Sequence, residues 1–211
     1  EIASCLVGSE MCIRDRFCYT PEPENGKIRV LLTARMIIEK GIFILTDAAI
    51  KLKEKYRDKV QFLLCGGLDD NPKAIKEEDL KRVCDGEYIQ WLGYRTDVLS
   101  LLKDCHIVAF PSYYKEGLPK SLIEATAVGR PIITTDSIGC KETVIEGYNG
   151  YLIPVQDSET LADRLEILIE DKALRQKMGK NSRCMAEKDF SIENVIAKHL
   201  EIYEILMTGN L

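Results

Sequence analysis

The sequence of 211 residues lacks any long hydrophobic run, since no apolar stretch approaches the ~20 residues that a membrane-spanning helix needs. It also lacks an excess of basic residues, because 29 Lys and Arg stand against 34 Asp and Glu, for a formal net charge of -5. Such a charge disfavours binding to nucleic-acid phosphates and strong electrostatic binding to anionic lipid. These absences predict a protein with no transmembrane segment and no nucleic-acid partner.

Metal-binding and disulfide patterns are also missing. The chain has two histidines, His106 and His199, and neither has a Cys or His at ligand spacing, so a zinc site is not expected. Eight cysteines occur without a Cys-x-x-Cys pair or a recognisable secretory signal, and Cys65 and Cys105 lie in or beside apolar runs. We therefore expect buried, reduced thiols in a cytosolic protein.

From Ile28 onward, short apolar runs alternate with segments of helical periodicity, which indicates βα units and a parallel sheet. The apolar runs are continuous, as in strands that are covered on both faces. The expected fold is α/β, a doubly wound parallel sheet of the Rossmann type. The expected strands are Ile28–Leu32, Val60–Cys65, Ile89–Leu92, His106–Phe110, Ile132–Thr134 and Tyr151–Ile153. The expected helices are Ile42–Tyr56, Ala74–Cys84, Val98–Lys103, Lys120–Val128, Glu159–Ile169, Lys172–Glu187 and Glu193–Leu206.

The amino-terminal residues need separate treatment. Residues 4–16 resemble the translation of sequencing-adapter read-through and show no periodicity of either kind. We therefore interpret residues 1–16 as a non-native leader and exclude them from reasoning about the fold. A Pro-rich linker is expected over residues 17–27, and one domain with carboxyl-terminal helices over residues 28–211.

Residues 111–124 carry most of the functional information. They run from the end of an expected strand, through a turn that contains Gly and Pro, into an expected helix. Helix N-termini bind anions, because their first N–H groups lack intrahelical partners and the helix dipole is positive there. A phosphate over Lys120 and Ser121 would leave the carboxylates of Glu116 and Glu124 on either side, free to bind hydroxyl groups. That arrangement suits a nucleotide diphospho-sugar.

The same segment resembles a known family. The spacing of Glu116 and Glu124 is similar to that in the retaining glycosyltransferases of the GT-B fold, specifically glycosyltransferase family 4. Residues 32–41 resemble the Arg…Lys-Gly diphosphate clamp of that family, and residues 129–142 and 149–154 match the segment after its Glu motif. The resemblance covers most of the chain from Ile28. It implies the carboxyl-terminal, donor-binding half of a GT-B enzyme.

Three residues are candidates for the catalytic step. The resemblance implies that Arg35 and Lys40 stabilise the departing diphosphate, and an Arg can bind phosphate oxygens in a bidentate manner. It also implies that Glu116 binds hydroxyls of the donor sugar and orients it. Taken alone, the residues favour a solvated Lys40 paired with Glu39 or Asp47. For Glu116 the alternative is a carboxylate that caps its turn, and both roles could hold at once.

Donor binding is expected to extend to neighbouring residues. The resemblance implies that Glu124 binds ribose hydroxyls, although the residues alone leave an exposed helix glutamate as an equal alternative. Gly93 and Tyr94 could contact the base through main-chain groups or stacking, or could simply end a strand. The candidate binding residues are Gly117, Leu118, Pro119, Lys120, Ser121, Glu124, Gly93 and Tyr94.

The expected activity is transfer of a hexosyl or N-acetylhexosaminyl group from a nucleotide-diphospho-sugar, and the expected donor is a UDP-sugar. No cofactor or metal is expected, because fixed cations would neutralise the diphosphate and the chain has no Asp-x-Asp motif. Asp69-Asp70 is interpreted as a solvated turn. Two alternatives remain open: a non-catalytic nucleotide-binding module, and a GT-B sugar-nucleotide epimerase, which would not predict the sequence Glu116-Gly-Leu-Pro.

The resemblance is greatest to bacterial enzymes that extend lipid-linked glycans for capsule, O-antigen or glycoprotein assembly. It implies a glycan or lipid-linked acceptor bound through an amino-terminal domain that these residues do not include, so this fragment alone is expected to be inactive. The expected location is the cytoplasm, with peripheral association of the full enzyme at the inner face of the plasma membrane.

Overall fold

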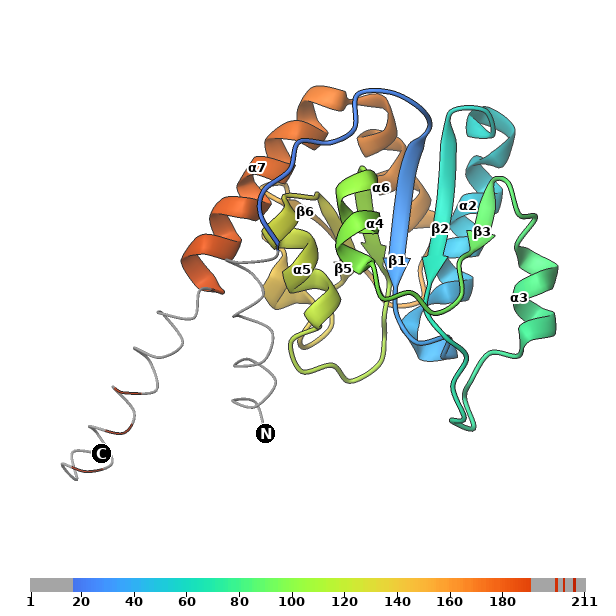
Figure 1. Ribbon diagram of the computed structural model, residues 1–211, viewed down its shortest axis with the longest axis horizontal. Helices are drawn as coiled ribbons and strands as arrows, with labels where there is room; N and C mark the ends of the chain where they lie inside the picture. The colour runs from blue at the N-terminus through green and yellow to red at the C-terminus, as the bar shows by residue number, and fades with distance from the viewer. Residues whose placement is uncertain (1–16, 191–199, 201–202, 204–206, 208–211) are drawn as a thin grey trace.

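A six-stranded parallel sheet forms the centre of the computed structural model, which describes residues 17–190, Leu200, Tyr203 and Met207 (Figure 1). The strand order is β3-β2-β1-β4-β5-β6, which is the order of a doubly wound Rossmann sheet. The predicted fold class is therefore confirmed. The strands are β1 Ile28–Thr33, β2 Val60–Cys65, β3 Ile89–Trp91, β4 Ile107–Phe110, β5 Ile132–Thr135 and β6 Gly150–Ile153.

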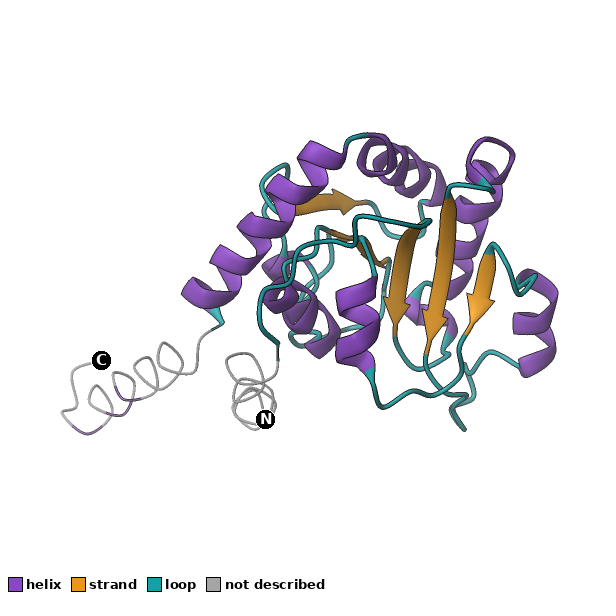
Figure 2. Ribbon diagram, turned by 45° about the horizontal axis from the view of Figure 1, so that its top comes forward, coloured by secondary structure: helices purple, strands orange, loops and turns teal. Residues whose placement is uncertain are grey.

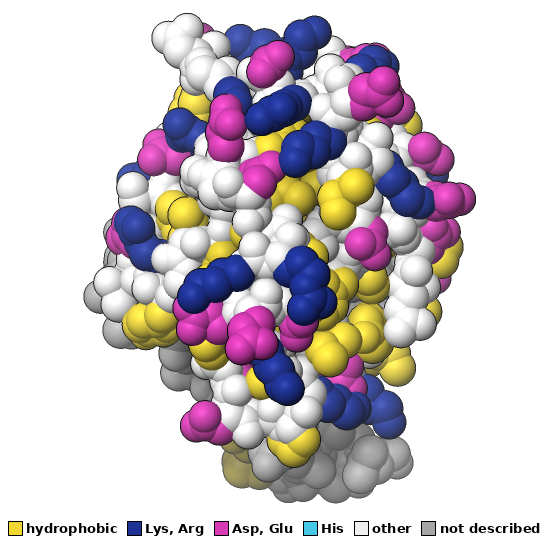
Figure 3. Space-filling model, turned by 90° about the vertical axis from the view of Figure 1, so that its right-hand side faces the viewer, with side chains coloured by type: hydrophobic (Ala, Val, Ile, Leu, Met, Phe, Trp, Pro, Cys, Tyr) yellow, Lys and Arg dark blue, Asp and Glu magenta, His cyan; other side chains and the backbone are white. Residues whose placement is uncertain are grey.

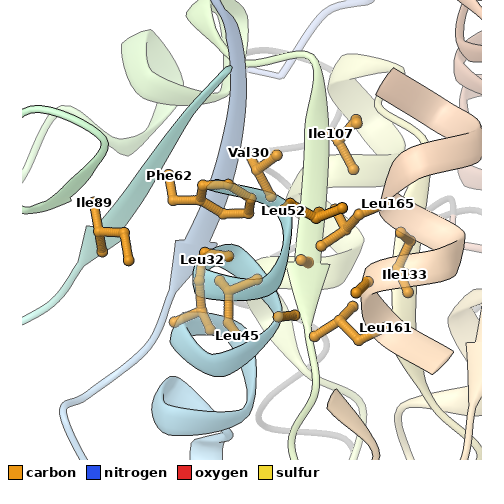
Figure 4. Packing of buried hydrophobic residues seen from close by; sticks show 14 of the residues in the cluster. Val30, Leu32, Leu45, Leu52, Phe62, Ile89, Ile107, Ile133, Leu161 and Leu165 are labelled. Carbon is orange, nitrogen blue, oxygen red and sulfur yellow. The ribbon is translucent and has the colours of Figure 1, made fainter. Parts of the chain in front are cut away.

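Helices cover both faces of the sheet (Figure 2). Leu32, Leu45 and Leu161 belong to the core on one face, where α2 and α6 pack (Figure 4). The neighbouring Leu31 belongs to the core on the other face, with residues of α4, α5 and α7, which explains why the strands are apolar at successive positions. The helices are α2 Ile42–Tyr56, α3 Glu77–Val83, α4 Val98–Asp104, α5 Lys120–Val128, α6 Ser158–Glu170 and α7 Lys172–Asp189, with short 3-10 helices η1 Ile38–Lys40 and η2 Lys141–Thr143.

The expected bounds agree with the structure to within one or two residues, except at α3. The prediction that this helix begins at Ala74 is wrong, because Ala74 forms a bridge with Ile37 and the Ile75 amide donates to the Met36 carbonyl oxygen at 2.8 Å. Those bonds hold the chain extended until Glu77. The expected helix Glu193–Leu206 lies outside the described residues, apart from Leu200 and Tyr203, as does the expected leader.

Residues 17–27, expected to be a linker, contain no helix or strand, but side chains of the domain form hydrogen bonds with them. They rise beside α5 and then run along the edge at which the strands begin, the upper edge in Figure 1. The buried Glu22 carboxylate accepts a bond from Arg175 Nε at 2.9 Å, and Arg130 Nη1 donates to the Thr20 carbonyl oxygen at 2.8 Å. Residues 20–27 are therefore held on the edge opposite the carboxyl ends of the strands, whereas Phe17, at the beginning of the segment, packs with residues of α5 and α7.

The surface that carries α3 and β3 has acidic and basic side chains interspersed (Figure 3). Neighbouring charges form ion pairs such as Lys81–Glu77 at 2.7 Å and Arg57–Glu87 at 3.7 Å. Within the described part of the chain, no helix is both long and apolar enough to cross a bilayer.

Cys65 and Cys105 are buried free thiols, as predicted, whereas Cys18 and Cys184 are exposed, so the expectation of buried thiols is wrong for those two. Burial raises the pKa of the Cys105 thiol to about 12, so this group stays protonated at neutral pH.

Candidate functional site

The carboxyl ends of β1 and β4 lie side by side at the centre of the sheet. The chain continues from β1 into α2 on one face and from β4 into α5 on the other, which makes this the point where doubly wound sheets bind ligands. The two loops also bond to each other, because the Tyr113 and Tyr114 amides donate to the Glu39 carbonyl oxygen at 2.9 and 3.2 Å. Gly41 permits this approach, since a Cβ there would lie 2.1 Å from the Pro111 carbonyl oxygen.

Lys40 and Glu116 meet at this junction. The Lys40 ammonium forms a hydrogen-bonded ion pair with Glu116 Oε1, and each side chain is only 11% exposed. Ser112 Oγ lies 3.0 Å from the same Oε1 and 3.2 Å from the Glu39 carbonyl oxygen, so its single proton can go to either. The structure thus joins two residues that are 76 positions apart in the sequence.

Aromatic rings complete the surroundings of Lys40. Its Nζ lies 4.9 Å from the centroid of the Tyr114 ring and 5.7 Å from that of Phe110, distances at which a cation is attracted by the π face. The alternative of a solvated Lys40 is not observed, because its side chain is largely buried and pairs with Glu116, while Glu39 pairs with Lys73. A cation is therefore kept in place beside the switch point, in surroundings with little water.

Arg35 is paired with a different carboxylate. Its side chain is 59% exposed, and Nη1 bonds to Asp69 Oδ2 at 2.8 Å. The other Asp69 oxygen accepts a bond from the Asn71 amide at 2.9 Å, as in the expected turn. Among the described residues, no group of three or more His, Cys, Asp or Glu side chains could hold a metal ion. The remaining guanidinium N–H groups of Arg35 could still bind a diphosphate, but the predicted role of Arg35 stays a prediction.

The second carboxylate, Glu124, lines a different space. A pocket of about 480 Å³ opens between the beginnings of α4 and α5, above the end of β1. It includes the predicted residues Lys120, Ser121 and Glu124 on one wall and Tyr94 on the other, so the structure brings these four together. The remaining lining residues are Phe17, Thr33, Arg95, Thr96, Val98 and Leu99.

The electrostatics of Glu124 follow from its position. Its side chain is 12% exposed, and burial raises the pKa of the carboxyl above its ordinary value, although the Lys120 ammonium at 3.7 Å opposes that rise. A buried carboxylate with one long ion pair retains acceptor capacity for hydroxyl donors.

The amino end of α5 separates Glu124 from the Lys40–Glu116 pair along the chain. Pro119 is the N-cap residue and provides no side-chain acceptor for the first amides of the helix. Gly117 is exposed and Leu118 half-buried in the turn before it. Such an end can bind an anion between the two carboxylates.

The loop after β5 supports the turn that carries Glu116. Gly139 has φ +88°, and a Cβ there would lie 1.7 Å from the Gly117 carbonyl oxygen and 2.7 Å from that of Glu116. Any larger residue would have to displace the turn. Because β4 lies between β1 and β5, the Glu116 turn is contacted by the loop after β1, which carries Lys40, and from the other side by the loop after β5, which carries Gly139.

Several residues of this region escaped the sequence reasoning. Arg95 and Thr96 directly follow the predicted Tyr94 and could have been found by extending that turn. Ser112 belongs to the quoted motif but has no charge to mark it, and Gly139 acts only through a contact between distant loops. Gly93 has φ +66°, and its carbonyl oxygen accepts a bond from the Gly66 amide at 2.9 Å, so it shapes the loop before Tyr94.

Comparisons with known proteins agree on one family. A family model described as glycosyl transferases group 1 matches residues 20–185. The N,N'-diacetylbacillosaminyl-diphospho-undecaprenol alpha-1,3-N-acetylgalactosaminyltransferase of Campylobacter jejuni is 36% identical over 177 residues, which are 83% of this chain and 44% of that protein.

Solved structures show the same architecture. Anabaena HepE in complex with UDP has 26% identity and a TM-score of 0.73, over 86% of this chain and 49% of HepE. The carboxyl-terminal domain of the group 1 glycosyl transferase LpcC from Francisella tularensis has 24% identity and a TM-score of 0.69, over 87% of this chain and 93% of that domain, which shows the fold alone. The chain thus spans about half the length of the Campylobacter jejuni enzyme and of HepE. The expected likeness to one half of a GT-B enzyme is confirmed.

Proposed function

This chain belongs to the glycosyl transferases group 1, and from that premise we propose that it is the donor-binding part of a retaining glycosyltransferase. The donor would be a UDP-sugar, and the transferred group a hexosyl or N-acetylhexosaminyl residue. One observation carries the proposal: a cation, the open end of a helix and two carboxylates lie around the switch point of a doubly wound sheet.

The diphosphate would lie over the amino end of α5. Lys40 is close to this place because its partner Glu116 lies in the turn that leads into the helix. When the bond from the sugar to the diphosphate breaks, the diphosphate leaves with the bonding electron pair. A fixed ammonium and helix amides stabilise such a charge without reorganising, and Arg35 would add a second cation. No metal or cofactor is needed for this part of the reaction.

The donor sugar would bind at Glu116. Within the described part of the chain, the hydrogen bonds that Lys40 and Ser112 donate to this carboxylate both end on Oε1. Oε2 can therefore accept hydroxyls of the sugar while Oε1 stays anchored, with the amides of Gly117 and Leu118 beside it. Anchoring of this kind orients the anomeric carbon and keeps the reacting groups in a productive arrangement.

The nucleoside would occupy the pocket that contains Glu124. Glu124 would accept the ribose hydroxyls, while the 78% exposed Tyr94 ring is available to stack on the base. UDP is the preferred nucleotide because HepE, whose fold matches over most of this chain, was crystallised with UDP.

The acceptor is proposed by analogy. The relative from Campylobacter jejuni is named for transfer to an undecaprenyl-linked sugar, so a glycan or lipid-linked glycan is the class that we propose here. The acceptor would bind outside these residues, and the whole enzyme would work in the cytoplasm, in contact with the inner face of the membrane. Retention is tested with the whole enzyme: the coupling constant of the anomeric proton in the product, measured by NMR, should show the same anomeric configuration as the donor.

We expect UDP to bind with the same Kd, within about twofold, in excess magnesium and in excess EDTA. The reason is that Lys40 and the helix amides, not a metal ion, would neutralise the diphosphate. Isothermal titration calorimetry measures both values. Binding that disappears with EDTA and returns with magnesium would contradict the metal-independent site.

We expect UDP affinity to fall as the pH falls through the pKa of Glu124, which burial raises above the ordinary 4.5. The ionised carboxylate accepts from two ribose hydroxyls, whereas the protonated form loses acceptor capacity, so binding is strong above that pKa and weak below it. The Kd of UDP is measured from acid to neutral pH for the wild type and for Glu124→Gln. The variant retains the titration of UDP itself, so identical profiles would contradict the role of Glu124.

A further inference from the structure

Thr33, the last residue of β1, has a hydroxyl without a partner. Its Oγ1 is the single buried side-chain oxygen or nitrogen in the described residues that makes no hydrogen bond. Other buried threonines all donate: Thr46 to the Phe43 carbonyl oxygen at 3.0 Å, and Thr126 to that of Ile123 at 2.7 Å. The same is true of Thr134, Thr135 and Thr143. Thr33 is thus an exception that needs a physical reason.

The position of Thr33 supplies one. Leu31, two residues earlier on the same side of β1, packs in the core with residues of α4 and α5. Thr33 continues that side of the strand beyond the core and lines the pocket that also contains Glu124 and Tyr94. Its side chain therefore forms part of the pocket between the beginnings of α4 and α5, at the end of β1, which is one of the two strands of the switch point.

A purely structural role would favour valine at this place. Valine has the shape of threonine and leaves no buried hydroxyl unpaired, and an unpaired buried hydroxyl destabilises the folded state. One rotation about χ1 exchanges the hydroxyl and the methyl group of threonine, so the hydroxyl can turn to a ligand in the pocket. A group that lowers stability and lines a binding pocket is typical of a functional position.

We propose that the Thr33 hydroxyl hydrogen-bonds to the nucleoside of the donor and contributes to nucleotide specificity. This inference rests on the proposed function, because it takes the Glu124 pocket as the nucleoside site. The bond forms only in the complex, where the nucleoside becomes the hydrogen-bond partner that Oγ1 otherwise lacks.

The test compares Thr33→Val, Thr33→Ser and the control Thr46→Val with the wild type. Thr46 is fully buried in α2, and its hydroxyl is already bonded within that helix. Calorimetry gives the Kd of UDP, and circular dichroism gives the Tm without ligand. We expect Thr33→Val to raise the Kd about five- to tenfold and to leave the Tm equal or higher by about 2–4 °C. Thr33→Ser should bind within about twofold of the wild type, as should Thr46→Val.

The outcomes separate this inference from the proposed function. If the wild type does not bind UDP, the proposed function fails and the inference fails with it. If the wild type binds UDP and Thr33→Val binds it equally well, the inference alone is overturned. A Thr33→Ser variant as weak as Thr33→Val, or a Thr33→Val variant with a clearly lower Tm, would assign a structural role and overturn it too.

Discussion

Replacing Lys40 with methionine is expected to lower the affinity for UDP about 100-fold. The substitution removes a cation that is fixed beside the amino end of α5. It also leaves the Glu116 carboxylate without its partner, so that a bare negative charge would face the diphosphate. Both effects act in the same direction, because a charge-assisted bond is lost and a repulsion is gained. Calorimetry with UDP measures the loss.

Stability must be separated from binding in this experiment. An unpaired, largely buried carboxylate is expected to lower the free energy of unfolding by about 3 kcal/mol. The double variant Lys40→Met/Glu116→Gln removes that charge, so it should recover stability without recovering UDP affinity. Lys51→Met is the matched control, since Lys51 is a 41% exposed residue of α2 that pairs with Glu159 on the surface. Wild-type affinity in the folded Lys40→Met variant would disprove the diphosphate role.

Replacing Gly139 with alanine is expected to weaken binding of the UDP-sugar at least tenfold more than it weakens binding of UDP, by about 1.4 kcal/mol or more. The new Cβ would overlap the carbonyl oxygen of Gly117, at 1.7 Å, and the turn must move to avoid it. Glu116 would move with the turn, away from Lys40 and from the place of the sugar. Discrimination between the two ligands is therefore the sensitive measurement.

Gly147→Ala is the matched control for this substitution. Gly147 also has a positive φ, +71°, but a Cβ there would meet no atom within 4 Å. Both variants carry the strain of a left-handed alanine, about 1–2 kcal/mol, whereas only Gly139→Ala moves the turn. Equal ratios of UDP-sugar to UDP affinity in both variants would show that Gly139 has no part in the sugar site.

The strands and most helices could be predicted because their signals are local. β2 and α2 are found at their expected bounds. A continuous apolar run indicates a strand that is buried on both faces, as in β2, and a 3.6-residue period indicates a helix that is buried on one face, as in α2. The beginning of α3 could not be predicted in this way. Ala74 has the highest intrinsic helix propensity, but it forms a bridge with Ile37 in the segment after β1, and no local pattern reports a partner that lies 37 residues away.

By itself, the sequence determined the doubly wound class and the two glutamates at either side of a helix start, because periodicity and motif spacing are properties of neighbouring residues. The tertiary structure alone decided which charges meet. Several strand orders would bury the same apolar runs equally well, but only the adjacency of β1 and β4 brings Lys40 to Glu116. The same adjacency leaves the Thr33 hydroxyl in a pocket without a partner, a property that depends on the surroundings of the residue and not on its identity.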